Sequence, residues 1–300
     1  MTGGENNTLR GGALMALTMA LYTANDALVK LLGRDMGLGA IITFRGLLIT
    51  LFMFALVLLA PGHGPDALRW LKNRVVLMRA FWDTAVTILY LSALMHMPIA
   101  NILAVMNLAP LLILPLAAWR LGERVGPGRI AAVAVGFAGA LLVVRPGTEG
   151  FNGWAALAFL AMAGVAGRDI STRFIPPGAP SLVVALANIL MVQAAGMALW
   201  ALEPASGPPT DMQWMTLSAC AVFLGTGYVL IIAAVRIAPV NETAIWRYTI
   251  IVWGVLAGWL AFGQFPDAPA LAGIALIMGG SIYVSLHEWR GSRRKDPAAR

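Results

Sequence analysis

The residue pattern best suited to binding chemistry lies in one apolar stretch of the chain. Arg79, Asp83, Thr87 and Tyr90 fall within about 80° of one another on a helical wheel, and Trp82 flanks them. Ionisable groups inside a bilayer are expensive, so such a stripe faces a cavity or a partner. One interpretation is a water-filled cavity in which Arg79 and Asp83 bind the charges of a zwitterion. The other is a self-neutralising Arg79–Asp83 pair packed between helices.

Two later apolar stretches carry further candidate substrate contacts. Trp246 offers a ring for stacking, and Arg247 offers a guanidinium for a carboxylate. Aromatic core packing, with Arg247 paired to an acid such as Glu242, is the alternative. Asn101 lies in an apolar run that also contains Pro110, where a proline ring can bend the helix and provide a hinge or a static kink.

Charged residues four apart recur near the start of each half of the chain. Asp26 and Lys30 have this spacing, and Asp169 and Arg173 repeat it. A structural ion pair is one interpretation of each. Proton coupling through Asp26 is the other, because burial disfavours a charged carboxylate. Glu242 is a third acid of this kind, either structural or coupling.

These residues must be positioned by membrane-spanning helices. The chain is 59% hydrophobic and 12% charged, with a mean hydropathy of +0.79, whereas a soluble domain is about 25% charged. A helix needs about 20 apolar residues to span a bilayer. Ten runs of this kind are found, at 11–32, 38–60, 74–95, 98–119, 128–145, 152–172, 181–202, 212–235, 239–262 and 268–287.

Charge distribution predicts the orientation of these spans. Most loop Lys and Arg residues fall on the side that also holds both termini, which predicts cytoplasmic termini in a bacterial-type inner membrane. The net charge of +7 is therefore a topology signal and not a nucleic-acid patch. The basic tail Arg290–Lys295 is expected on anionic headgroups.

Metal, cofactor and catalytic chemistry have no support in the sequence. One cysteine and three histidines, far apart, exclude a disulfide framework and predict no metal site. No Walker A, HExxH or GxSxG motif occurs, so we expect no cofactor and no enzyme of these classes.

An internal repeat divides the chain into residues 1–147 and 148–300, the second ending in the basic tail. A shift of 141 residues aligns the ends of the two halves without a gap. The matched pairs include Pro98 with Pro239, Gly122 with Gly263, and Gly139 with Gly280. Five spans per half is an odd number, so the halves enter the membrane from opposite sides. The expected fold is an all-α membrane protein of ten transmembrane helices in two inverted five-helix repeats.

The repeated segments also resemble a known family. Pro98–Gly147, with Leu121–Arg124 between two spans, is similar to the EamA-type signature of the drug/metabolite transporter superfamily. The second copy, Ala238–Val284, has Gln264 where a glutamate is expected, and Arg45 lies where that family often has an arginine. The resemblance implies a ten-helix transporter, most similar to bacterial amino-acid exporters.

The sequence therefore predicts a secondary transporter that works by alternating access. We expect it to export small amphipathic metabolites, in particular amino acids, aromatic or of broad specificity. Its expected partners are the small-molecule substrate and the lipid bilayer, with the chain a monomer or a weak homodimer. The alternatives are a membrane-embedded enzyme or lipid-handling protein that uses Asp83 or Glu242, and a channel.

Overall fold

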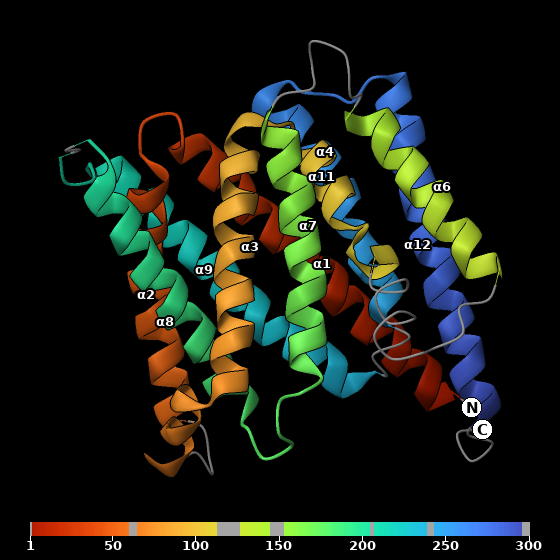
Figure 1. The fold of residues 1–300 in the computed structure, drawn as a ribbon, viewed down its shortest axis with the longest axis horizontal. Coiled ribbons are helices and arrows are strands. Elements are labelled where there is room, and N and C mark those ends of the chain that lie inside the picture. Colours follow the sequence, from red (N-terminus) through yellow and green to blue (C-terminus); the bar gives the residue numbers. More distant parts are fainter. Residues whose placement is uncertain are drawn as a thin grey trace. The chain divides into compact units, whose positions relative to one another are not determined.

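The computed structural model describes residues 2–59, 65–112, 127–144, 153–204, 207–238 and 243–295, and every regular element in these ranges is a helix. The helices are α1 (Thr2–Leu32), α2 (Leu38–Leu59), η1 (Pro65–Lys72), α3 (Arg74–His96), α4 (Ile99–Met106), α6 (Pro127–Val144), α7 (Gly153–Thr172), α8 (Ser181–Leu202), α9 (Asp211–Ile237), η2 (Ala244–Tyr248), α11 (Thr249–Phe262) and α12 (Ala268–Lys295) (Figure 1).

Apolar helices occur at all ten predicted positions within the described ranges. Seven are long and apolar enough to cross a membrane, and three shorter apolar helices cover 99–112, 130–144 and 268–283. The predicted locations are thus confirmed. Whether the three short helices also span the bilayer stays a prediction.

Local sequence explains where several helices begin and end. The Asn73 side chain caps α3 by accepting from the amides of Val75 at 2.9 Å and Val76 at 3.3 Å. Helix α4 ends at Met106, the residue whose carbonyl would clash with the ring of Pro110 in a continuous helix. The bend expected from this proline coincides with a two-residue turn at 107–108, after which residues 109–112 are helical again.

The ninth predicted span also differs from a continuous α-helix. The segment Ala244–Tyr248 is a 3₁₀ helix, and the α-helix α11 starts only at Thr249. A 3₁₀ turn has 3.0 residues per turn, so the face assignments of an α-helical wheel do not extend through it.

The chain forms two compact units, each of which takes helices from both halves of the sequence. Residues 24–97 and 156–225 form what we call the α2–α8 unit. Residues 1–23, 98–155 and 226–300 form the α6–α12 unit.

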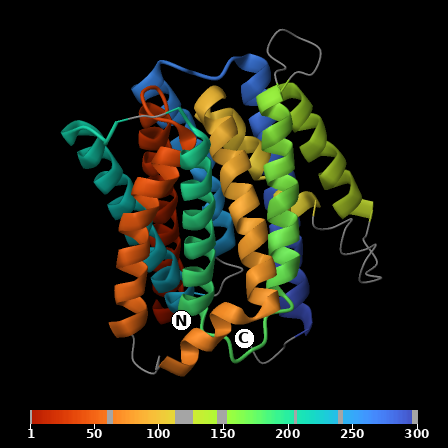
Figure 2. The same cartoon turned by 60° about the vertical axis from the view of Figure 1, so that its left-hand side comes forward.

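In the α2–α8 unit, α2 and α8 pack as an antiparallel pair (Figures 1 and 2). Gly39, near the start of α2, lies against the backbone of Trp200, near the end of α8. Met53, near the end of α2, shares a hydrophobic cluster with Leu186, near the start of α8. A side chain at Gly39 would collide with that backbone, so glycine is required for this close approach.

In the α6–α12 unit, α6 and α12 are likewise antiparallel. A Cβ at Gly139 would lie 2.6 Å from the carbonyl oxygen of Gly273, and one at Gly280 would lie 2.9 Å from that of Ala132. Small residues thus bring the two backbones together.

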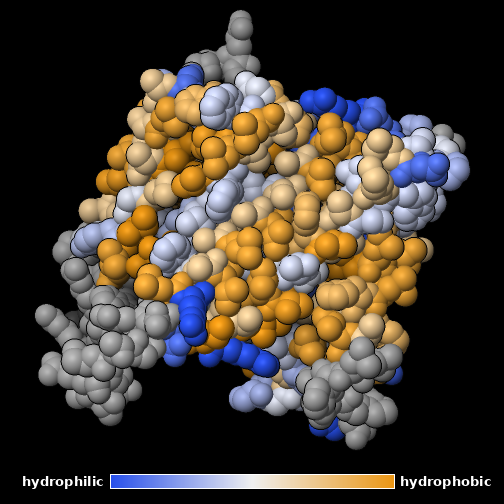
Figure 3. All heavy atoms as spheres, turned by 180° about the vertical axis from the view of Figure 1, so that it is seen from behind, coloured by the Kyte–Doolittle hydropathy of each residue, from blue (hydrophilic) through white to orange (hydrophobic). Residues whose placement is uncertain are grey.

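Much of the described surface is apolar. Leu51, Leu141 and Leu260 are examples of large hydrophobic side chains that are more than half exposed. Figure 3 shows that hydrophobic residues cover most of the face it displays. Such a surface suits contact with lipid and not with water.

Candidate functional site

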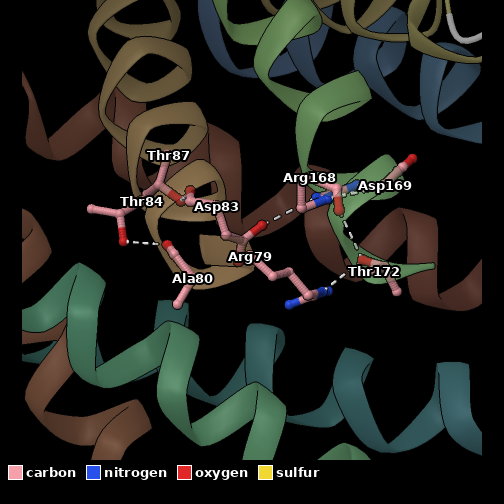
Figure 4. A network of polar contacts seen from close by, with 8 residues as sticks. All are labelled: Arg79, Ala80, Asp83, Thr84, Thr87, Arg168, Asp169 and Thr172. Carbon is pink, nitrogen blue, oxygen red and sulfur yellow. Dashed lines mark hydrogen bonds and ion pairs between the residues drawn. The ribbon is translucent and has the colours of Figure 1, made fainter. Parts of the chain in front are cut away.

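Charged residues meet between α3 and α7, within the α2–α8 unit (Figure 4). Arg168 contacts two carboxylates, with its Nη1 atom 3.2 Å from Asp83 and its Nη2 atom 2.9 Å from Asp169. The Nε atom of Arg79 donates to the hydroxyl of Thr172 at 2.9 Å. We call these five residues the α3–α7 ion network.

Glycines in α7 allow the two helices of this network to approach. A Cβ at Gly164 would lie 2.7 Å from Val86, and one at Gly167 would lie 3.0 Å from the ring of Trp82. Trp82 therefore packs against the α7 backbone next to the charged residues. Its position agrees with the predicted flank of the polar stripe.

The ion network differs from the pairing considered for this stripe. Among the described residues, Asp83 pairs with Arg168 and not with Arg79. The Thr87 hydroxyl donates to the backbone oxygen of Asp83 at 2.8 Å, within its own helix. Arg168 is not among the predicted site residues, and it lies inside α7. Its position beside Asp169 in an apolar helix is the sequence signal that identifies it.

A second polar cluster is buried among α1, α2 and α3 of the same unit. Asn25 donates from Nδ2 to Asp26 Oδ1 at 3.0 Å and accepts from Arg45 Nη1 at 3.4 Å. Tyr90 donates to the other carboxylate oxygen of Asp26, Oδ2, at 2.5 Å. Only 8% of Asp26 and 6% of Arg45 are exposed. We call these four residues the Asp26–Arg45 network.

Two guanidinium nitrogens of these networks are buried and have no acceptor among the described residues. They are Nε of Arg45 and Nη1 of Arg79. A buried donor without a partner costs roughly 1–3 kcal/mol, and more when it is charged. Native proteins keep few such groups, so each calls for an explanation such as a ligand, a water or an ion.

Lys30 bonds the end of helix α3. Its ammonium group donates to the carbonyl oxygens of Leu94, at 2.9 Å, and Met97, at the C-terminal end of α3. A cation at this end of a helix satisfies carbonyls that have no intrahelical partner. Asp26 therefore bonds Asn25 and Tyr90, and Lys30 bonds the end of α3, whereas the sequence predicts an i, i+4 ion pair between the two residues.

The remaining predicted site residues belong to the α6–α12 unit or lie outside the described residues. Trp246 lies against Gly12 of α1, and Trp253 donates to the carbonyl of Ala16 at 3.1 Å. These contacts favour the packing interpretation for the tryptophans. Arg247 is exposed in η2, and Asn101 is half-buried in α4. Glu242 and the segment Leu121–Arg124 lie outside the described residues.

Within the described part of the chain, no group of three or more His, Cys, Asp or Glu side chains is arranged to hold a metal ion. The chemistry of both networks is instead that of hydrogen bonding and charge pairing between Arg, Asp, Asn and hydroxyl groups.

Comparison with protein families identifies the class of the chain. The profile described as "EamA-like transporter family" matches twice, at residues 9–145 and 152–286. A solved crystal structure resembles the fold with a TM-score of 0.63 and 22% identity, covering 92% of this chain and 96% of the other.

Three characterised bacterial proteins are similar over nearly their full length. A riboflavin transporter from Brucella anthropi is 25% identical, covering 93% of this chain and 99% of the relative. The pseudopaline exporter CntI from Pseudomonas aeruginosa is 26% identical, covering 92% and 96%. An S-adenosylmethionine uptake transporter from Rickettsia felis is 26% identical, covering 96% of both chains.

Proposed function

The chain belongs to the EamA-like transporter family, and from this premise we propose that it moves a small amphipathic metabolite by alternating access. Like its family and relatives, it is a multi-pass membrane transporter of small metabolites, and it is not an enzyme. We place it in a bacterial-type inner membrane with both termini in the cytoplasm.

The observation that carries the mechanism is the α3–α7 ion network. Two helices that are apolar enough to span a membrane meet through Arg168 and two carboxylates, with side-chain exposures of 26% for Arg168, 21% for Asp83 and 44% for Asp169. Charges at membrane depth occur where a protein lines a water-accessible path. We assign this network to the substrate path, where the Arg168–Asp83 pair breaks and re-forms as α3 and α7 separate, while Asp169 stays beside Arg168 on α7.

An inverted repeat supplies the two states that alternating access requires. Equivalent helices of the two halves pack antiparallel in both α2 with α8 and α6 with α12. Two halves of opposite direction produce this arrangement. It supports our assignment of residues 1–147 and 148–300 as inverted five-helix repeats, which the two family matches follow closely.

The proposed substrates are amphipathic metabolites that carry an amino-carboxylate group, with export of amino acids as the leading candidate. Similar proteins carry riboflavin, pseudopaline or S-adenosylmethionine, so the fold accommodates metabolites larger than a standard amino acid. These relatives include both an exporter and an uptake transporter, which means that direction must be measured.

We retain the predicted residues as candidates within this proposal. The substrate contacts are Arg79, Trp82, Asp83, Tyr90, Asn101, Trp246 and Arg247, and the coupling or structural charges are Asp26, Lys30 and Glu242.

Counterflow in proteoliposomes tests the proposal. Vesicles are preloaded with each standard amino acid, riboflavin or S-adenosylmethionine, and entry of the labelled compound is measured. We expect saturable, trans-stimulated uptake of at least one amino-carboxylate compound. Asp83→Asn should reduce it, while Asp211→Asn, at the exposed start of α9, should not. Absence of flux for the whole panel with folded protein would refute the proposed substrate class.

A further inference from the structure

The side chain of Asn25 stands between two buried opposite charges. Its oxygen accepts from Arg45, and its amide nitrogen donates to Asp26. The guanidinium and the carboxylate are therefore linked through a neutral amide instead of by a direct ion pair. Direct contact would be the usual way to compensate such charges.

A carboxamide in this position presents the same pattern as an α-amino-carboxylate. It offers an acceptor oxygen to a cation and a donor N–H to an anion, and the two are joined through one carbon atom. An amino acid offers two carboxylate oxygens and an ammonium group with two carbon atoms between them, so it spans a slightly longer gap than the amide. Its charges complement those of Arg45 and Asp26 more strongly than a neutral amide does.

Arg45 has unused capacity for such a ligand. Its Nε–H is buried and has no acceptor among the described residues, and its bond to Asn25 is long, at 3.4 Å. A carboxylate has two oxygens and can bind two guanidinium N–H groups at once. A carboxylate that approached Arg45 would supply the acceptor that the Nε–H lacks.

Tyr90 prepares Asp26 for the other half of the ligand. It donates to Oδ2 of Asp26, which leaves Oδ1 as the oxygen bonded by Asn25. When the Asn25 amide swings away, Oδ1 becomes the acceptor for an ammonium group. Tyr90 is thus a positioning residue that fixes the direction of the carboxylate.

We propose that Arg45 and Asp26 form the recognition site for the α-amino-carboxylate group of the substrate, and that Asn25 occupies this site internally until the substrate displaces it. The inference rests on the proposed transport function and deepens it, since it names the chemical group recognised. It assigns to Arg45 the carboxylate contact that the sequence pattern gave to Arg79.

Ligand binding to the detergent-purified full-length chain tests this directly. Thermal stabilisation is measured with the standard amino acids and S-adenosylmethionine, and then with phenylalanine, phenethylamine and 3-phenylpropanoate as a matched set. We expect amino-carboxylate compounds to bind. The two analogues that lack one charged group should bind at least about tenfold more weakly, which corresponds to about 1.4 kcal/mol.

Asn25→Ala separates this proposal from a structural role of the amide. The substitution keeps both charges and removes the internal competitor, so we expect binding of the amino acid to be tightened severalfold. Weaker binding by a folded Asn25→Ala variant would overturn the proposal.

Arg45→Lys tests the guanidinium while keeping its charge. We expect roughly tenfold weaker binding of phenylalanine and little change for phenethylamine, which has no carboxylate. Arg74→Lys, at the exposed first residue of α3, is the matched control and should leave the preference for phenylalanine over phenethylamine intact. Equal loss for both ligands in Arg45→Lys would overturn the proposal.

The two proposals fail in distinguishable ways. Binding that follows this pattern without any counterflow would refute transport and leave the recognition site standing. Saturable counterflow with no preference for compounds bearing both charges would refute the recognition site and leave transport standing. Failure of every amino-carboxylate probe to bind folded protein would also refute the site.

Discussion

The α2–α8 unit places similar residues in two very different settings. The Asp26–Arg45 network is deeply buried and bridged by an amide, and like the α3–α7 ion network it contains one guanidinium nitrogen with no acceptor among the described residues. In the α3–α7 ion network, Arg168 contacts its carboxylates directly and the paired side chains are partly exposed. Arginine and aspartate therefore have two roles in this unit.

The two networks differ in the free energy that they can contribute to ligand binding. Partly exposed ion pairs contribute little to the free energy of folding, because water and salt replace each partner easily. Such pairs can break and re-form as helices move. A buried, incompletely satisfied charge pair retains an unfavourable free energy that a complementary ligand removes. We therefore connect the first setting with recognition and the second with movement.

The largest expected contrast is in stability. Arg45→Met removes the guanidinium of this network and leaves Asp26 buried, and we expect a loss of about 3–5 kcal/mol in the free energy of unfolding. Arg168→Met should lose about 1 kcal/mol or less, because Asp83 and Asp169 can hydrate. Titration with a denaturing detergent measures both. Equal losses would mean that the two networks do not differ in the way described.

The double variant Arg45→Gln with Asp26→Asn sharpens the same comparison. Removal of both buried charges leaves neutral amides that can hydrogen-bond, so stability should recover most of the loss of the more damaging single variant. Recovery of stability without recovery of amino-acid binding would show that these charges serve recognition more than folding.

Arg168→Lys tests the geometry of the ion network. The guanidinium bonds Asp83 and Asp169 through different nitrogens, whereas an ammonium is a single point charge. We expect initial counterflow rates to fall roughly threefold to tenfold, as for the loss of one hydrogen bond of ordinary strength. Arg173→Lys, at an exposed residue just after α7, is the control. Unchanged rates in Arg168→Lys would remove the ion network from the transport cycle.

Thiol labelling compares access to the two networks. Cys220 is buried, with its sulfur 3.9 Å from the backbone oxygen of Asn25. Thr172→Cys in a Cys220→Ala background places the thiol in the partly exposed network instead. We expect a membrane-permeant maleimide to react with this introduced thiol severalfold faster than with the native Cys220. Similar rates would contradict the assignment of one network as buried and the other as open.

Salt dependence gives the smallest expected effect. At 1 M salt the screening length falls to about 3 Å, so exposed pairs weaken more than buried ones. The stability difference between the wild type and Arg168→Met should shrink towards zero. The stability difference between the wild type and Arg45→Met should persist at the same salt concentration. A parallel decrease in both would argue against the different burial of the two networks.

Hydrophobic run length is enough to predict where the helices lie, because each apolar run must be buried in lipid or protein. Helical periodicity also places Asp83 and Tyr90 on one side of α3, where they bond Arg168 and Asp26. Both of these rules depend only on local sequence, which explains why they transfer to the structure.

The pairing of charged side chains on different helices could not be predicted in the same way. Asp83 and Arg168 are 85 residues apart, and their meeting depends on how α3 packs against Gly164 and Gly167. The i, i+4 rule favours pairing within one helix instead. The 3₁₀ turn of η2 escapes prediction for a related reason, since tertiary context overrides the α-helical period there.

The antiparallel contact of α2 with α8 has a consequence for biosynthesis. Gly39 and Trp200 are separated by 161 residues, so α2 leaves the ribosome long before its packing partner exists. At about 5–20 residues per second, it waits roughly 8–32 s. During that interval, the backbone groove at Gly39 has no packing partner from α8. The first half of the nascent chain is thus an incomplete assembly that depends on lipid or the insertion machinery until translation of the second half closes it.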